Sequence, residues 1–67
     1  MYQTLLTTLS ENIFTITINR PDKLNALNKT VIRELGEAVE EIYQNDLIRA
    51  GIITGAGSRA FVAGADI

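Results

Sequence analysis

Hydrophobic and polar residues alternate near the start of the chain in the way typical of β-strands. The apolar members of residues 13–19 fall on one face of such a strand: Phe14, Ile16 and Ile18. Leucine and threonine also favour a strand over residues 2–9, and Ser10-Glu11-Asn12 between the two runs has the composition of a turn. The pattern therefore predicts a β-hairpin over residues 2–19.

The middle of the chain changes to the period of an amphipathic helix. Asn28 is a suitable N-cap, and the helix is expected to run to about Tyr43 or Gln44. Its apolar stripe is Val31, Leu35, Ala38, Val39 and Ile42. Its acidic residues are expected on the opposite, solvated face: Glu34, Glu37, Glu40 and Glu41. Gly36 lowers helix propensity by up to about 1 kcal/mol relative to alanine, and close packing on a sheet would explain its presence.

A loop over residues 20–27 and a short apolar run over residues 50–54 complete the predicted elements. The run does not alternate, so we expect a strand covered on both faces, as in a parallel sheet. Strand, strand, helix, strand is an α/β order, with a right-handed crossover through the helix. The predicted core is Phe14, Ile16, Ile18, Leu35, Val39, Ile42, Ile52 and Ile53, and Tyr2 and Tyr43 are expected to be partly buried.

Composition limits the chemistry that this chain can perform. Its 67 residues amount to one domain at most, residues 1–67, with eight acidic and six basic residues and a net charge of −2. Cysteine and histidine are absent from the sequence, which excludes Cys or His metal sites, Cys nucleophiles and a Ser-His-Asp triad within it. No basic stripe and no apolar run of membrane-spanning length occur, so we expect neither a nucleic-acid partner nor a membrane partner, and a cytoplasmic location by default.

The glycine-rich end of the chain has more than one interpretation. Residues 55–60, Gly-Ala-Gly-Ser-Arg-Ala, fit the G-x-G-x-x-A pattern of dinucleotide-binding turns, or form a strand-terminating turn that needs positive φ. In residues 63–66, Ala-Gly-Ala-Asp, small side chains leave main-chain N–H groups open to a ligand oxygen. That pattern indicates an anion or carbonyl site, although Asp66 can equally cap a following helix.

Two motifs resemble the signatures of the enoyl-CoA hydratase/isomerase (crotonase) superfamily. Residues 19–28, Asn-Arg-Pro-Asp-Lys-Leu-Asn-Ala-Leu-Asn, resemble its N-R-P-x-K-x-N-A-L-[NSD] signature. Residues 53–57 and 60–67 resemble its second signature, which ends in A-G-A-D-[IL]. The resemblance implies a crotonase-like ββα-superhelix, of which this chain would be the N-terminal portion.

The resemblance also implies a ligand and a site. The ligand is an acyl-CoA thioester whose enolate is stabilised by backbone N–H groups, one of them at Ala65. Coenzyme A is part of the substrate, so no separate cofactor and no metal are expected. The residues implied to lie along the CoA path are Lys23, Leu24 and Ala26 on one side and Ala63, Gly64, Asp66 and Ile67 on the other.

The resemblance favours hydration of 2-trans-enoyl-CoA by a longer protein that forms homo-oligomers, trimers or hexamers. The glutamates that move protons in the family's hydratases lie on later segments, so the 67-residue chain alone is expected to be inactive. An alternative is a non-catalytic module that persists by self-association, because a domain this small has a thin folding margin.

Overall fold

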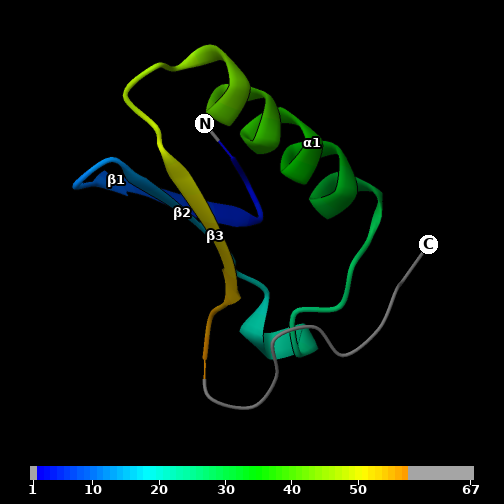
Figure 1. Cartoon of the computed structure of the whole chain (residues 1–67). Helices are drawn as coiled ribbons and strands as arrows, with labels where there is room; N and C mark the ends of the chain where they lie inside the picture. Colours follow the sequence, from blue (N-terminus) through cyan, green and yellow to red (C-terminus); the bar gives the residue numbers. More distant parts are fainter. Residues whose placement is uncertain (1, 58–67) are drawn as a thin grey trace.

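The computed structural model describes residues 2–57, which form a three-stranded sheet with one helix packed on it (Figure 1). The elements in chain order are β1 (Leu5–Ser10), β2 (Ile13–Ile18), the 3-10 turn η1 (Pro21–Lys23), α1 (Lys29–Gln44) and β3 (Ala50–Gly55). The predicted hairpin, helix and third strand are thus confirmed. β1 starts at Leu5 rather than residue 2, because the N–H groups of Gln3 and Thr4 bond to a helix side chain instead of to the sheet.

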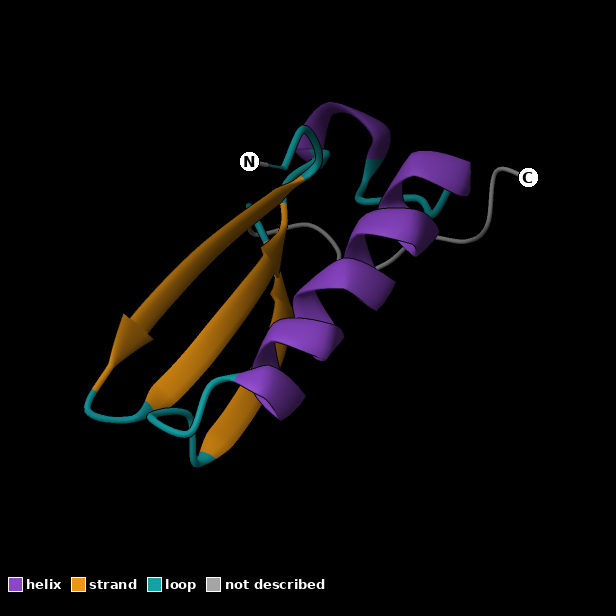
Figure 2. Cartoon of the chain, turned by 90° about the horizontal axis from the view of Figure 1, so that it is seen from above, coloured by secondary structure: helices purple, strands orange, loops and turns teal. Residues whose placement is uncertain are grey.

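The strands lie in the order β1-β2-β3, so β2 is central. β1 pairs with β2 antiparallel, with Leu5 opposite Ile18 and Ser10 opposite Ile13. The hairpin turn has two residues rather than the three predicted, and both have positive φ: Glu11 at 51° and Asn12 at 67°. Such turns match the twist of the strands that they join. β3 pairs with β2 in parallel, after α1 has crossed one face of the sheet (Figure 2).

The core lies between α1 and the face of the sheet that it covers. The buried hydrophobic side chains are Leu5, Phe14, Ile16, Ile18, Val31 and Ala38. Leu35 and Ile42 are half-buried against them, as the apolar stripe predicted. Gly51 provides a close approach, since a Cβ atom there would lie 2.8 Å from Cδ1 of Ile42.

Several predictions about burial were wrong. Ile52 and Ile53 are each 48% exposed, because β3 is an edge strand of the sheet formed by residues 2–57. Tyr43 is 81% exposed. Gly36 is exposed with open space around the position of a Cβ atom, so close packing does not explain it.

The face of the sheet opposite α1 carries no charged side chain in the three described strands. Side chains alternate along a strand, and the cross-strand partners of the buried Phe14, Ile16 and Ile18 point to the same face as these residues. The residues between them in each strand therefore point to the opposite face. This outer face consists of Leu6, Thr8, Ser10, Ile13, Thr15, Thr17, Ala50, Ile52 and Thr54. Leu6 and Ile52 are about half exposed there.

Candidate functional site

The first motif forms a compact loop between β2 and α1. Pro21 starts η1, where its missing N–H costs nothing, and Leu24 and Asn25 follow with positive φ of 50° and 57°. Backbone bonds close the loop: the N–H of Leu24 donates to the Pro21 oxygen at 3.1 Å, and that of Asn25 donates to the Arg20 oxygen at 2.7 Å. Lys23 on this loop is exposed.

Asn25 joins this loop to the end of β3. Its side chain is 1% exposed, its Oδ1 accepts from the N–H of Arg20 at 2.8 Å, and its Nδ2 donates to the carbonyl of Ala56 at 2.8 Å. A guanidinium N–H of Arg20 also donates to the carbonyl of Ala26 at 2.5 Å. The sequence reasoning missed Asn25, although asparagine within a turn motif is a signal for a residue that tolerates positive φ.

The turn after β3 is also bonded to β2. The N–H of Ala56 donates to the carbonyl of Ile18 at 2.8 Å, which extends the β2–β3 pairing by one bond. Gly57 has a φ of 82°, and a Cβ atom there would lie 3.4 Å from Cβ of Pro21. The prediction of a positive-φ turn is therefore confirmed for Gly57, whereas Gly55 is the last residue of β3.

The structure brings part of the implied ligand-binding set together. Lys23, Leu24 and Ala26 lie on one loop, with Leu24 and Ala26 half-buried, and Asn25 connects that loop to Ala56. The other implied residues lie outside the described residues: Ala63, Gly64, Ala65, Asp66 and Ile67. Within residues 2–57 there is no group of three or more His, Cys, Asp or Glu residues placed to hold a metal ion.

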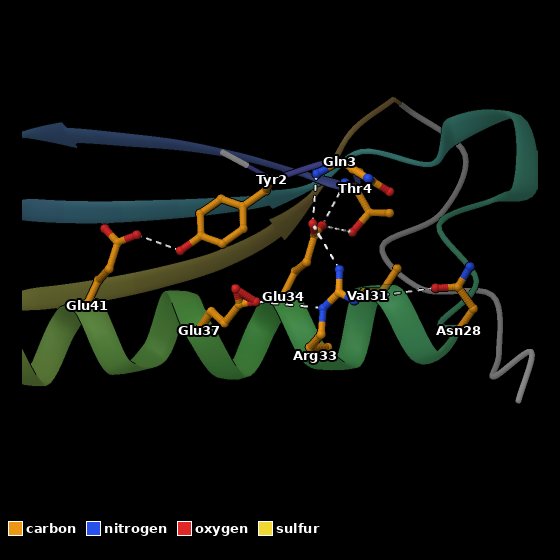
Figure 3. A network of polar contacts seen from close by, with 9 residues as sticks. All are labelled: Tyr2, Gln3, Thr4, Asn28, Val31, Arg33, Glu34, Glu37 and Glu41. Carbon is orange, nitrogen blue, oxygen red and sulfur yellow. Dashed lines mark hydrogen bonds and ion pairs between the residues drawn. The ribbon is translucent and has the colours of Figure 1, made fainter.

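A second polar centre forms where α1 faces the segment before β1 (Figure 3). Both carboxylate oxygens of Glu34 accept hydrogen bonds: from the N–H of Gln3 at 2.8 Å, from the N–H of Thr4 at 2.8 Å and from the Thr4 hydroxyl at 2.6 Å. The side chain is only 3% exposed, so its predicted place on the solvated helix face was wrong. A carboxylate can occupy the buried stripe here because the backbone donors of residues 3 and 4 satisfy it.

The environment of Glu34 acts on its pKa in two directions. Burial, the largest influence, raises the pKa, because it removes the charged form from water. The hydrogen bonds from Thr4 and Gln3, together with the positive charge of Arg33 at 3.9 Å, act the other way. Their sum outweighs burial, and the pKa of Glu34 is lowered from its ordinary value.

Tyr2 extends the same contact region along α1 (Figure 3). Its hydroxyl donates to Oε1 of Glu41 at 2.5 Å, and this bond, with partial burial and the nearby carboxylates, raises the pKa of Tyr2 to about 12. Tyr2, Leu5 and Glu41 are among the residues that border an open groove of ≈ 640 Å³ between β1 and α1. Among residues 2–57, none of the residues that the two motifs implied borders this groove.

Over the described residues, α1 and the short turn η1 lack the length and apolar character that crossing a membrane would require.

Comparison with known proteins gives a consistent result. The family model described as enoyl-CoA hydratase/isomerase matches residues 8–67. The short-chain-enoyl-CoA hydratase of Clostridium acetobutylicum is 50% identical over 52 residues, which cover 78% of this chain and 20% of that protein. The 1,2-epoxyphenylacetyl-CoA isomerase of Escherichia coli is 36% identical over 67 residues, covering all of this chain and 25% of that protein.

Solved structures agree with the sequence relatives. The chain matches the crystal structure of an enoyl-CoA hydratase/isomerase from Mycobacterium paratuberculosis with a TM-score of 0.93 and 41% identity, covering 98% of this chain and 26% of that one. This confirms that the observed hairpin, helix and strand are the N-terminal part of a crotonase-type fold. The chain spans about a quarter of the length of such relatives. With its family model matched over residues 8–67 and both motifs in place, the chain belongs to the enoyl-CoA hydratase/isomerase family.

Proposed function

We propose that this chain is part of an enzyme that binds acyl-CoA thioesters and hydrates 2-trans-enoyl-CoA. The observation that carries the proposal is the family match over residues 8–67, supported by a relative whose name is short-chain-enoyl-CoA hydratase. The other named relative is an isomerase acting on a CoA ester, so the acyl-CoA substrate class has broader support than the reaction type.

The proposed chemistry places the N–H of Ala65 against the thioester oxygen. Negative charge develops on that oxygen as the enolate forms, and a fixed backbone dipole stabilises it more in the transition state than in the ground state. One such donor is worth roughly 2.7–4 kcal/mol in a measured enzyme example. Ala63, Gly64, Asp66 and Ile67 are proposed to line the path of the CoA moiety beside it.

The loop that follows β2 is proposed to contact the other side of the CoA moiety, through Lys23, Leu24 and Ala26. Support comes from the exposure of Lys23 and from the hydrogen bonds that hold the loop beside the end of β3. An exposed ammonium group is suited to a phosphate-bearing ligand, and two half-buried apolar side chains are suited to its aliphatic part.

The test is an assay of the whole protein that carries this chain. We expect loss of the enoyl-thioester absorbance when it is mixed with crotonyl-CoA, and saturable binding of CoA in a calorimetric titration. The 67-residue polypeptide should show no turnover in the same assay. Absence of CoA binding at millimolar concentration in the whole protein would contradict the proposal. We further propose that the whole protein is cytoplasmic and forms a homo-oligomer, a trimer or hexamer. Sedimentation of the whole protein would measure the oligomeric state.

One observation favours a second candidate, a self-associating module without catalytic activity. The outer face of the sheet carries no charge, and Leu6, Ile13 and Ile52 on it are each more than a third exposed. Small domains often gain stability by association. Sedimentation of the 67-residue polypeptide distinguishes the two, because a folded monomer would rule out obligatory association.

A further inference from the structure

We infer that Asn25 is a positioning residue for the acyl-CoA reaction, whose side-chain amide holds the turn after β3 in register with the loop after β2. The inference rests on the proposed function, since it concerns the segment that leads from β3 toward Ala65. It concerns a residue that makes no proposed contact with the ligand and acts through the backbone of Ala56.

The geometry of the amide is that of a bridge between two segments far apart in the sequence. Oδ1 accepts from the N–H of Arg20, five residues away, and Nδ2 donates to the carbonyl of Ala56, 31 residues away, both at 2.8 Å. The side chain is 1% exposed, so water does not compete for these bonds. Both bonds belong to one planar group, and a shift of either segment therefore breaks its bond or moves the other.

Both backbone polar groups of Ala56, its N–H and its carbonyl, form hydrogen bonds. Its N–H donates to Ile18 of β2, and its carbonyl accepts from Asn25. Gly57, the next residue, has the positive φ that glycine adopts without strain, and a Cβ atom there would lie 3.4 Å from Cβ of Pro21 on the same loop. Two hydrogen bonds at Ala56 thus hold the turn at the point from which residues 58–67 continue.

Asparagine is suited to this position for two independent reasons. It supplies an acceptor and a donor on one rigid amide, which aspartate and leucine, close to it in size, do not. It also tolerates the φ of 57° that the backbone has here better than most residues. The Arg20 side chain donates to the carbonyl of Ala26, which adds a second side-chain bond on the loop side of the bridge.

The test compares Asn25→Asp with a matched control in the whole protein. Asn25→Asp keeps the size and the acceptor but removes the donor to Ala56. Asn12→Asp makes the same chemical change at the other end of the sheet, where Asn12 has a φ of 67° and donates to the carbonyl of Leu47 at 2.7 Å. Asn12 is exposed and belongs to no part of the proposed site.

We expect Asn25→Asp to lower kcat for crotonyl-CoA by about 10–100-fold with KM changed less than about threefold, because misplacement of reacting groups by about 1 Å has effects of that size. Asn12→Asp should leave both constants within about twofold. A role of Asn25 confined to folding would lower the melting temperature of Asn25→Asp without this division between kcat and KM.

Each outcome decides the question. Inactive wild-type protein overturns the proposed function and this inference with it. Active wild-type protein with an unchanged kcat in Asn25→Asp overturns the inference alone. If Asn25→Asp does not fold, Asn25→Gly removes the side-chain bonds to Arg20 and Ala56 and accepts the positive φ without strain. An unchanged kcat in Asn25→Gly, or its failure to fold as well, assigns Asn25 to the fold rather than to positioning.

Discussion

Glu34→Gln is the most informative single change, because it removes one charge from a buried side chain without changing its shape. The carboxylate accepts from three donors of residues 3 and 4, two at 2.8 Å and one at 2.6 Å. Glutamine offers one acceptor oxygen, and its NH2 group, which is a donor, faces at least one of these three donors. The variant therefore leaves a buried N–H or O–H group without a partner.

The expected loss of stability follows from that count. A hydrogen bond to a charged group contributes about 1.5–3 kcal/mol, and an unsatisfied buried donor costs about 1–3 kcal/mol. We expect the free energy of unfolding to fall by about 2–4 kcal/mol, measured by urea denaturation followed by circular dichroism. Glu37→Gln is the control, since Glu37 is an exposed residue of the same helix whose ion pair with Arg33, at 3.7 Å, should contribute less than about 1 kcal/mol.

The dependence on pH gives an independent check. The pKa of Glu34 is lower in the folded protein than in the unfolded chain, so its contribution is complete above the unfolded pKa and is lost as pH falls through the folded pKa. The stability difference between wild type and Glu34→Gln should therefore be largest near neutral pH and shrink in acid. A loss no larger than that of Glu37→Gln, or a difference that stays constant with pH, would refute this account of the buried carboxylate.

Three further changes test separate features of the structure. Asn28→Ala should lower stability by about 1 kcal/mol in the same urea experiment, because the Asn28 side chain caps α1 by accepting from the N–H of Val31 at 2.9 Å, and Asn28→Ser should restore most of it. Gly36→Ala should raise stability by about 0.5–1 kcal/mol, since the position is helical, exposed and open around a Cβ atom; a decrease would contradict the open space around this position. Glu41→Gln should move the phenol titration of Tyr2 from about 12 toward 10, as followed by ultraviolet absorbance. An unchanged titration would exclude Glu41 as the main cause of the raised pKa. Because the pKa of Tyr2 is higher in the folded protein than in the unfolded chain, the contribution of Tyr2 to stability is complete below the unfolded pKa and declines as pH rises toward the folded pKa.

Sequence pattern predicted the elements well because local periodicity determines them. The alternation around Phe14 and the N-cap at Asn28 placed β2 and α1 to within a residue or two. Burial was predicted less well where it depends on distant segments. Ile52 looks like a core residue by type, but its exposure depends on what lies beside β3, which local sequence does not specify.

The residues of the candidate site also differ in whether local sequence or distant contacts define them. Lys23 and Ala26 were predicted as site residues from their resemblance to a family signature, because a signature records local sequence, and this stays a prediction. Asn25 and Glu34 were missed, and both act through contacts with segments about 30 residues away. Helical periodicity put Glu34 among the exposed acidic residues, although it lies three positions after the buried Val31. Only the position of the segment before β1 shows that its charge has partners.

The uncharged outer face of the sheet has a practical consequence for handling the polypeptide. Like charges keep concentrated proteins apart, and this plane of threonine and aliphatic side chains offers none. Attraction between such planes is not ionic, so added salt would not disperse them, whereas moderate urea would weaken them. A lysine at the exposed Thr8 would act as a gatekeeper against precipitation while leaving the helix side of the sheet untouched.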